Sequence, residues 1–394
     1  MSGETFLENE LNIISKSFDK ILIFPINASV NSKKTRKITA KNIEVIPYNS
    51  KEYENRKFIY ILNSMKYLFN KENEGKTIKE MAYESYFLSI CYVESKKILK
   101  KLDNIKFNTD DEIYIYSYWL YTSAKIATIL KEQFKKRKLK TVAFSRAHGF
   151  DIYADASARN YLPQRNALIS QLDKIFTCSK NGEEYLIKKY HEANKIETSY
   201  LGTIDHGITN NSHDDIFRIV SCSRMVNLKR IDLIIDALKK LKNSNLKFEW
   251  THIGGGNLFE HIQQRVDLEL KDIKVNLLGS ISNSEVYSYY KKHSVDLFIN
   301  VSSTEGLPVS IMEAISFGIP IIATDVGGTS EIVVDNENGF LIDKNFDIED
   351  LSSLILKIAN TKSNKYGIKA RLIWEKKYNA KDNYKKFIKS ILKL

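Results

Sequence analysis

The chain has 394 residues, of which 43% are hydrophobic and 27% charged, and its formal net charge is +12 at pH 7. This length is more than one ordinary hydrophobic core accommodates, so we expect two domains. The composition is that of a soluble globular protein, because no window comes near the roughly 18 uninterrupted apolar residues of a membrane-spanning helix. We also expect no secretory signal, since the N-terminus lacks a basic stretch followed by an apolar one.

The first half alternates strands with helical stretches. We expect strands in four segments and helices in three others, the last of them only mostly helical. The strands are predicted at residues 20–26, 111–119, 140–149 and 174–179, and the helices at 120–138, 180–190 and 51–101.

The second half shows the same alternation more clearly, with apolar residues at helical spacing between short apolar strands. Strands are predicted at residues 217–224, 248–256, 274–280, 295–303, 319–326 and 338–342, and helices at 231–241, at 282–293 and from 327. Such alternation indicates an α/β fold with parallel sheets covered by helices. We place the domain boundary near residues 203–207, which gives an N-terminal domain of residues 1–203 and a C-terminal domain of residues 204–377. The tail, residues 378–394, completes the first domain.

The basic charge and the cysteines restrict partners and setting. Lysines cluster at residues 131–140 and 377–394, and most of them fit solvated helix faces. The alternative is attraction to an anionic membrane surface or an anionic substrate. Nucleic acid is not expected, because no zinc-finger or RNA-recognition motif accompanies the charge. Three cysteines without metal-type spacing exclude a complete disulfide framework and favour a reducing, cytoplasmic setting.

The segment STEGLPVSIMEA, residues 303–314, places one glutamate before a helix and another inside it. Pro308 suits the first turn of a helix and Gly318 the position just past its end, so a helix over about 308–317 is predicted. Glu305 then lies in the loop before the helix, and Glu313 lies in its second turn. A helix N-terminus after a parallel strand binds anions, and carboxylates accept hydrogen bonds from sugar hydroxyls. A helix-capping role would explain Glu305 alone, and an exposed helix position would explain Glu313 alone. Neither explains the whole segment.

Two further segments follow strands of the same predicted sheet. Arg224 and Lys229 follow the strand at 217–224, and together they can neutralise a diphosphate leaving group, although two surface cations would look the same. Gly254, Gly255 and Gly256 could cradle a phosphate or form a tight turn. A nicotinamide fingerprint is not supported, because Phe259 stands where the third glycine of G-x-G-x-x-G is needed.

These motifs, in this order, resemble the nucleotide-sugar-dependent glycosyltransferases of family 4, from about residue 199 to 342. The resemblance implies the GT-B fold: two Rossmann-like domains facing a central cleft, with a C-terminal helix that crosses back to the first domain. It also implies a retaining reaction. Glu305 would contact donor-sugar hydroxyls, Glu313 the ribose, and Arg224 and Lys229 the diphosphate. The other donor residues implied are Gly306, Leu307 and Pro308 at the sugar, and Gly254, Gly255, Gly256, Leu278, Gly279 and Ser280 near the base. Arg230 departs from the glycine that is frequent in the family, which puts the geometry of that loop in question.

The first half resembles the family less closely. Residues 144–166 are similar to a segment of bacterial polysaccharide-assembling members, in which a histidine at the place of His148 faces the donor sugar. Arg146 and Arg165 could meet anionic groups of an acceptor. Gly3 and Glu4 could line the acceptor side, or residues 3–8 could simply cap the first helix, with Thr5 and Glu8 at capping-box spacing. The strand that opens related chains is expected to be missing here.

The sequence therefore predicts a retaining glycosyltransferase that moves a sugar from a nucleotide diphosphate sugar to a glycan or lipid-linked acceptor in cell-surface polysaccharide synthesis. A UDP-sugar is favoured over GDP-mannose. No metal or other cofactor is expected, because the two cations can stabilise the leaving group. The alternatives are a sugar-nucleotide epimerase of the same fold, a nicotinamide oxidoreductase and a non-catalytic partner subunit, and fold alone does not choose among them. Peripheral contact with the inner face of the cell membrane is a further expectation, and the oligomeric state is left open.

Overall fold

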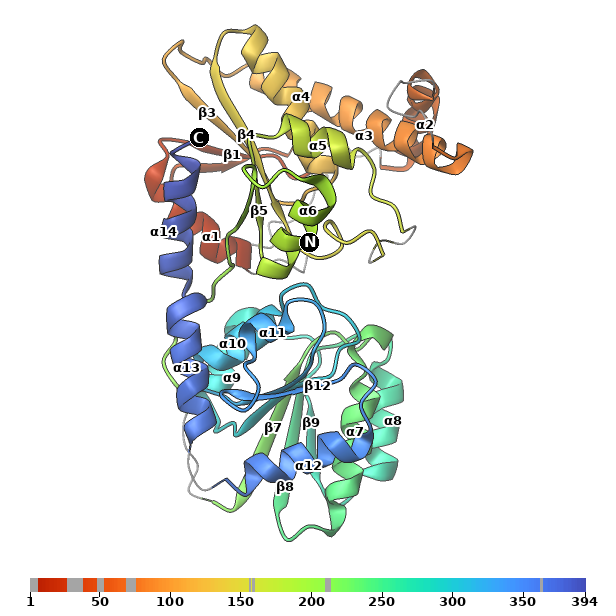
Figure 1. The fold of residues 1–394 in the computed structure, drawn as a ribbon, viewed down its shortest axis with the longest axis vertical. Helices are drawn as coiled ribbons and strands as arrows, with labels where there is room; N and C mark the ends of the chain where they lie inside the picture. The colour runs from red at the N-terminus through yellow and green to blue at the C-terminus, as the bar shows by residue number, and fades with distance from the viewer. Residues whose placement is uncertain are drawn as a thin grey trace. The chain divides into compact units, whose positions relative to one another are not determined.

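The computed structural model describes residues 6–26, 38–47, 53–68, 76–155, 157, 160–209, 214–361 and 364–394. The chain divides into two compact units (Figure 1). Unit 1 contains Met1–Ser199 and Lys385–Leu394, and unit 2 contains Tyr200–Tyr384. The chain thus passes from unit 1 to unit 2 after Ser199 and returns after Tyr384.

Unit 2 is built on one fully parallel sheet of six strands, in the order β12-β11-β10-β7-β8-β9. All six were predicted. Their bounds are β7 Ile216–Cys222, β8 Lys247–Ile253, β9 Lys274–Leu277, β10 Leu297–Asn300, β11 Ile321–Thr324 and β12 Gly339–Ile342. The first strand in the sequence, β7, lies in the middle between β8 and β10. The strand order therefore reverses between β7 and β10, and this is where α/β sheets bind ligands.

Helices cover the sheet of unit 2, which explains why its strands read as continuous apolar runs. In one layer α7 (Ile231–Lys240) packs against α8 (Phe259–Glu269) and α12 (Ile348–Ala359), and elsewhere α10 (Val309–Ser316) packs against α13 (Lys365–Lys377). The remaining helices are α9 (Asn283–Lys292) and α11 (Thr329–Ile332). Ile231, Ile234, Ile235 and Leu238 form the buried face of α7, at the spacing that predicted this helix.

The predicted helix after β10 is confirmed, as α10, with a shift of one residue at each end. Pro308 is its N-cap with φ −71°, and the helix runs from Val309 to Ser316. Gly318 follows at φ +74°, in the left-handed region that favours glycine. The N-terminus of α10 thus lies at the same sheet edge as the loop that carries Glu305.

Unit 1 contains a parallel sheet in the order β3-β4-β5-β6 and a separate parallel pair β1-β2. The bounds are β1 Ile21–Ile23, β2 Ile43–Val45, β3 Glu112–Ser117, β4 Lys140–Ala147, β5 Lys174–Thr177 and β6 Ile196–Thr198. The four predicted strands are present, whereas β2 and β6, of three residues each, were not predicted. The helices are α1 Phe6–Ile14, α2 Tyr53–Ser64, α3 Ile78–Leu102, α4 Thr122–Lys136, α5 Arg165–Gln171 and α6 Lys180–Tyr190.

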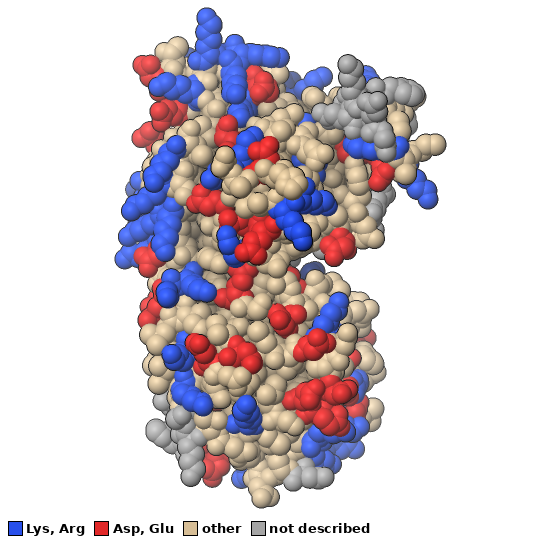
Figure 2. All heavy atoms as spheres, in the orientation of Figure 1, with Lys and Arg blue, Asp and Glu red and all other residues tan. Residues whose placement is uncertain are grey.

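The tail helix α14 (Ala380–Ile391) belongs to unit 1 from Lys385 onward. The ring of Phe387 lies 4.9 Å from that of Phe176 and 6.1 Å from that of Phe144, measured between centroids. The opposite face of α14 exposes Lys381, Lys385, Lys386 and Lys389, and Figure 2 shows basic side chains gathered along this edge of unit 1. The lysines of the tail therefore form a solvated helix face.

Most of the other lysine-rich segment is exposed too, but Lys131 is an exception. Its side chain is buried and its Nζ lies 2.7 Å from Asp173 Oδ1. In the part of the chain that the structure describes, no helix combines the length and the apolar character needed to cross a bilayer.

Candidate functional site

Lys229 and Glu305 meet at the point where the strand order of unit 2 reverses. Lys229 follows β7 and Glu305 follows β10, and these two strands are parallel neighbours. Lys229 Nζ donates to Glu305 Oε1 over 2.5 Å, and Asn300 Nδ2 donates to the same oxygen over 3.1 Å. Both side chains keep some exposed surface, 22% for Lys229 and 12% for Glu305. Two of the predicted site residues, 76 positions apart in the sequence, are therefore in direct contact.

The loops that carry this pair are bonded to each other through the main chain. Ser303 N donates to Leu228 O over 2.8 Å, and Ser303 Oγ donates to the same carbonyl over 3.3 Å. Leu228 is the residue before Lys229, so these bonds fix the spacing between the two loops. The ion pair is thus held by the backbone as well as by the side chains.

A glycine permits a second loop to cross directly over Glu305. Gly328 N donates to Gly306 O over 2.7 Å, which ties the loop after β11 to the loop after β10. Gly327 has φ +58°, and a Cβ at this position would lie 1.8 Å from Glu305 O. Only glycine satisfies both conditions. Next to this crossing, Gly306 and Leu307 are half-buried and Pro308 is buried.

Arg230, the departure from the family pattern, keeps the backbone conformation that a glycine would adopt. Its φ is +47° and its ψ +43°. The guanidinium donates from Nε to Val301 O and from Nη1 to Lys344 O, each over 2.7 Å. These bonds offset the cost of the left-handed conformation in a residue with a Cβ. The geometry of the loop is preserved, and Arg230 is a structural residue.

The three glycines after β8 form a close backbone crossing with the loop that carries Arg224. Ser223 N donates to Ile253 O over 3.0 Å, and Met225 N donates to Gly255 O over 2.9 Å. A Cβ on Gly254 would lie 1.8 Å from Ser223 O, and one on Gly256 would lie 2.2 Å from Met225 O. Between these contacts, the side chain of Arg224 is exposed. The glycines therefore bring the Arg224 loop against the end of β8.

A buried histidine, His252, supports the same loop. His252 Nε2 lies 3.1 Å from Ser223 O, and because a carbonyl only accepts, Nε2 carries the proton. Its Nδ1 then accepts from Ser221 Oγ over 2.8 Å, and Ser221 Oγ accepts from Trp250 Nε1 over 3.0 Å. Burial lowers the pKa of His252 to about 4, against the opposing effect of the bond to Ser223. No sequence motif marks this histidine, since its role depends on strand pairing.

The predicted residues after β9 lie beside the glycine stretch. Leu278 N donates to His252 O over 3.0 Å, and Gly254 N donates to Gly279 O over 2.9 Å. A Cβ on Gly255 would lie 2.7 Å from Ser280 Oγ. The side chain of Leu278 is 39% exposed and can offer an apolar surface to a flat ring. Loops after four adjacent strands thus share one edge of the sheet.

Glu313 lies on α10 and is nearly enclosed, with 5% of its surface exposed. Its Oε1 accepts from Asn283 Nδ2 over 2.8 Å and from Tyr287 OH over 3.0 Å, and both donors lie on α9. Burial raises the pKa of Glu313, although the two hydrogen bonds oppose this. Asn283 and Tyr287 were not predicted, because nothing in the sequence links α9 to α10.

His148 follows β4 in unit 1, and both of its ring nitrogens are engaged. Nε2 lies 3.0 Å from Tyr118 O and Nδ1 lies 3.2 Å from Cys178 Sγ. The carbonyl requires a proton on Nε2, so Nδ1 accepts from the thiol, and burial raises the pKa of that thiol to about 12. Burial and the charge of Arg146 lower the pKa of His148 to about 3. The ring is therefore neutral, and its role toward a donor sugar stays a prediction.

Arg146 requires a correction. Its side chain has no exposed surface, its Nε lies 3.1 Å from Glu10 Oε2, and its Nη1 donates to Ser199 O over 2.8 Å. The guanidinium also lies over the ring of Phe387, at 4.1 Å from the centroid. A side chain enclosed in this way offers no atom to an acceptor. The structure gives Arg146 a packing role beneath the tail helix in place of the acceptor-side role that we expected.

Arg165 requires the same correction. It is 5% exposed at the start of α5, and its Nη1 donates to Leu120 O over 2.8 Å. Burial raises the pKa of the Asp151 carboxyl to about 6, and the charge of Arg165 opposes this rise. Arg165 thus supports the loop after β3 from inside and presents little surface to an anionic acceptor. Gly3, Glu4 and Thr5 lie outside the described residues.

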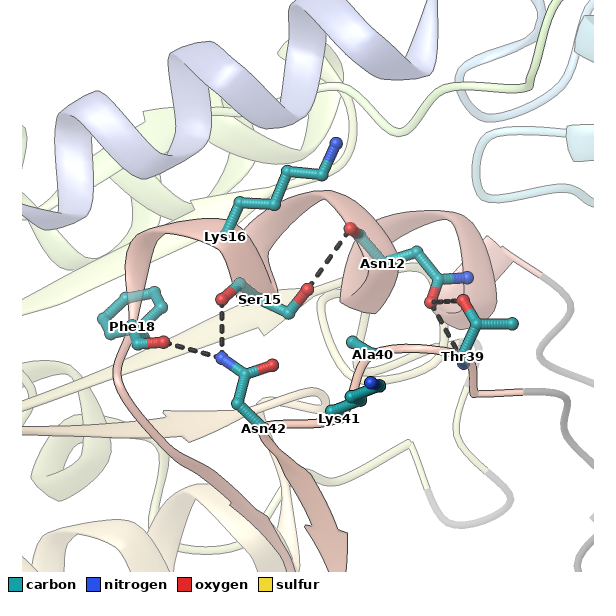
Figure 3. Close-up of a pocket in the computed structure, with 8 residues that line it drawn as sticks. All are labelled: Asn12, Ser15, Lys16, Phe18, Thr39, Ala40, Lys41 and Asn42. Carbon is teal, nitrogen blue, oxygen red and sulfur yellow. Dashed lines mark hydrogen bonds between the residues drawn. The ribbon is translucent and has the colours of Figure 1, made fainter.

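The cavity of unit 1 shown in Figure 3 has a volume of about 510 Å³ and lies between the end of α1 and residues 39–42. Asn42 Nδ2 donates to Ser15 O and Phe18 O over 2.8 and 2.7 Å, and Thr39 Oγ1 donates to Asn12 Oδ1 over 3.1 Å. These bonds attach residues 39–42 to α1 (Figure 3). None of the predicted site residues lines this cavity, so it is not the candidate site.

Comparison with known sequences gives a family match in the second half of the chain. Residues 208–377 match the family described as glycosyl transferases group 1. The amylovoran biosynthesis glycosyltransferase AmsK of Erwinia amylovora is 26% identical over 218 residues, which cover 52% of this chain and 53% of that protein. A glycosyltransferase of Methanocaldococcus jannaschii is 28% identical over 295 residues, covering 74% and 77%. The chain thus spans about half the length of AmsK and 77% of the length of the Methanocaldococcus jannaschii protein.

Solved structures with the same fold extend over the whole chain. The lipopolysaccharide outer core galactosyltransferase WaaB aligns with a TM-score of 0.69 at 19% identity, covering 100% of this chain and 97% of that one. Anabaena HepE in complex with UDP and glucose aligns with a TM-score of 0.67 at 14% identity, with the same coverage. At these identities the likeness concerns the fold. Residues 208–377 thus match the family of glycosyl transferases group 1, and the fold of the chain is GT-B.

Proposed function

We propose that this protein is a retaining glycosyltransferase that moves a sugar from a nucleotide diphosphate sugar, most simply a UDP-sugar, to a glycan acceptor. The observation that carries the proposal is the contact between Lys229 and Glu305 at the strand reversal of unit 2. The contact supports the proposal because an ammonium suited to a phosphate lies beside a carboxylate suited to sugar hydroxyls, in the loop before α10. Neither surface cations nor a capping acid would require that arrangement.

In the proposed reaction the bond between the anomeric carbon and the diphosphate oxygen breaks, and the acceptor oxygen bonds to the same face of that carbon. The leaving phosphate takes the proton of the acceptor hydroxyl, so atoms and charge balance without a protein base. Lys229 and Arg224 stabilise the negative charge that develops on the diphosphate. Glu305 orients the sugar through its hydroxyls, and Glu313 binds the ribose. With two cations in these roles, we propose that no metal is required.

The comparisons support the classes of donor and product without naming either. HepE was solved with UDP and glucose, and AmsK is named for the biosynthesis of amylovoran. The O-antigen biosynthesis glycosyltransferase WbnH of Escherichia coli is 28% identical over 192 residues, covering 45% of this chain and 52% of that protein. We infer a UDP-sugar donor and a cell-surface polysaccharide or glycoconjugate as product.

The proposal is tested first by calorimetric titration with UDP, GDP and ADP. We expect UDP to bind and Lys229→Ala to weaken binding about tenfold or more, because a charge contact to the diphosphate is lost. If none of the three nucleotides binds, the protein is a non-catalytic partner subunit and the proposal fails.

The second test separates transfer from epimerisation. A panel of nucleotide sugars is incubated with the protein and glycan acceptors, and the products are followed by mass spectrometry. A transferase increases the mass of an acceptor by one sugar residue and releases the nucleoside diphosphate. A sugar-nucleotide epimerase would leave every acceptor unchanged and convert the donor to an isomer of the same mass, which chromatography detects.

We also propose peripheral contact with an anionic membrane, on the inner face of the cell membrane, through the exposed lysine face of α14. Lys381, Lys385, Lys386 and Lys389 present like charges on one side of this helix. Each basic side chain near an anionic surface contributes about 1 kcal/mol. Sedimentation with vesicles that contain an anionic lipid should bring the protein down at low salt and release it at high salt, whereas zwitterionic vesicles should not bind it.

A further inference from the structure

Aromatic rings gather at the carboxyl end of the sheet in unit 1, outside the set of residues that the proposed reaction uses for the donor nucleotide. Trp119 follows β3, and His148 and Phe150 follow β4. The ring centroid of Trp119 lies 4.3 Å from that of His148 and 4.8 Å from that of Phe150. Phe150 is 44% exposed and Trp119 is half-buried. We call these three rings the aromatic platform.

The two loops that carry the platform are fixed by one buried carboxylate. Asp151 Oδ2 accepts from Leu120 N over 2.8 Å, and Asp151 Oδ1 accepts from His148 N over 2.7 Å. Asp151 has no exposed surface, and Arg165 donates to the carbonyl of Leu120 from below. The rings on the two loops are therefore held at a set spacing before any ligand arrives.

The chemistry of the platform favours a sugar ring over an anion. Arg146 and Arg165 are both buried, so among the described residues of this segment the platform offers ring faces and no exposed guanidinium. A pyranose ring has one face of C–H groups, which an aromatic face can cover, and a rim of hydroxyls that stays in contact with water or polar groups. The rings of His148 and Phe150 are tilted by 47° and 38° to the ring of Trp119, so the three rings do not form one flat stack.

We propose that the aromatic platform binds a pyranose ring of the acceptor glycan by stacking on Trp119 and Phe150. The proposal rests on the proposed function and deepens it, because it assigns the acceptor to sugars with an apolar ring face. Asp151 is a positioning residue in this arrangement, and it acts only through the two loops. Phe150, which is the most exposed of the three rings, supplies most of the covering surface.

Tryptophan fluorescence gives a direct test, because Trp119 is the one tryptophan with exposed surface among the three of the chain. Trp250 and Trp374 are fully buried, so quenching by acrylamide reports on Trp119. Methyl β-glucopyranoside, methyl β-galactopyranoside and methyl 2-acetamido-2-deoxy-β-glucopyranoside are the probes. We expect at least one of them to protect Trp119 from the quencher. Sorbitol carries hydroxyls without a ring face and should give no protection.

Variants of Phe150 make the test specific. Phe150→Ala should weaken the binding of the protecting glycoside about three- to tenfold, which is the range expected for loss of one aromatic contact. Phe150→Tyr keeps the ring and should bind as the parent protein does. Ile368→Ala removes another exposed apolar side chain, 60% exposed on α13, and serves as the matched control.

Two results would overturn the platform: no glycoside protects Trp119 more than sorbitol does, or Phe150→Ala binds the protecting glycoside as tightly as Phe150→Tyr. Titration of the same samples with UDP examines the proposed function separately, through unit 2. A protein that binds UDP but fails the glycoside test retains the proposed function without the platform. A protein that protects Trp119 with a glycoside but binds no nucleotide has a sugar site and is not a transferase.

Discussion

Lys229 Nζ and Glu305 Oε1 lie 2.5 Å apart across the reversal of strand order in unit 2. Each residue satisfies the charge of the other before a donor binds. In the proposed function, a bound diphosphate would compete for the ammonium and release the carboxylate toward sugar hydroxyls. The pair would then couple phosphate binding to sugar orientation.

Replacing Glu305 should therefore reduce transfer more than it reduces stability. We expect Glu305→Gln to lower kcat/KM about 100-fold, as loss of one preorganised polar contact typically does. The release of nucleoside diphosphate in steady state is the measurement. Glu349→Gln breaks a surface pair in which Lys240 Nζ lies 2.5 Å from Glu349 Oε1, and its activity should not change. Equal activity of the two variants would remove Glu305 from the site.

Gly327→Ala should disturb the Glu305 loop through the backbone. A left-handed alanine costs about 1–2 kcal/mol, and here a Cβ would also lie 1.8 Å from Glu305 O. Gly207→Ala is the matched control, because Gly207 has φ +94° with no atom within 4 Å of the added Cβ. Urea unfolding should show a larger loss for Gly327→Ala, and only this variant should lose activity. Similar losses in both would mean that the loop moves aside without consequence.

Substitutions of Arg230 should separate backbone strain from its hydrogen bonds. Arg230→Ala loses the bonds to Val301 and Lys344 and retains the left-handed φ, whereas Arg230→Gly loses the same bonds but relieves the strain. We expect the glycine variant to be about 1 kcal/mol more stable than the alanine variant in urea unfolding. If alanine proves as stable as glycine, the conformation at this position is not left-handed in solution.

His252 should make the stability of unit 2 depend on pH. Its folded-state pKa of about 4 lies below the unfolded value of about 6.5, so between these values the unfolded chain binds the extra proton. The stabilising contribution is complete above pH 6.5 and decreases by roughly 3 kcal/mol as the pH falls through 4.

Urea unfolding at pH 7 and pH 4.5 checks this expectation. His252→Gln should lose less stability between the two pH values than the parent protein, and His261→Gln, at an exposed position, should behave as the parent does. An unchanged difference for His252→Gln would mean that the buried imidazole is protonated without cost.

The tail helix should contribute to the stability of unit 1 through one ring. Phe387 is 1% exposed, and its ring contacts those of Phe144 and Phe176. We expect Phe387→Ala to lower the free energy of unfolding by about 3–5 kcal/mol. Lys386→Ala, on the exposed face, should change it by less than about 0.5 kcal/mol. Thermal unfolding followed by circular dichroism is the measurement. Equal melting temperatures for the two variants would contradict the assignment.

The sequence was sufficient for features that are local or repeated along the chain. The strands of unit 2 were predictable because both faces are buried and their residues are apolar without interruption. Pro308 and Gly318 marked the ends of α10 to within one residue. The proximity of Glu305 and Lys229 was predictable because the loops that follow adjacent parallel strands share one sheet edge.

Features that depend on packing were not predictable. Arg146 and Arg165 looked like surface cations, because a sequence does not show that Glu10 or Leu120 encloses a guanidinium. His252, Asn283 and Tyr287 escaped notice since each acts across a strand or helix pair. The strands β2 and β6 have three residues each, like β1, but neither lies in an apolar run such as that of residues 20–26.

At Gly254, Gly256 and Gly327 the main chain of one loop packs against the main chain of another. These contacts involve no side chain that a substitution could replace. Such contacts fix the positions of the Arg224 and Glu305 loops, but they cannot be adjusted by substitution without moving a loop. Under the proposed function, changes of donor preference are therefore expected at neighbouring side chains such as Leu278 and Ser280. The sheet edge thus combines backbone contacts that tolerate no side chain with a few exposed positions that substitution can change.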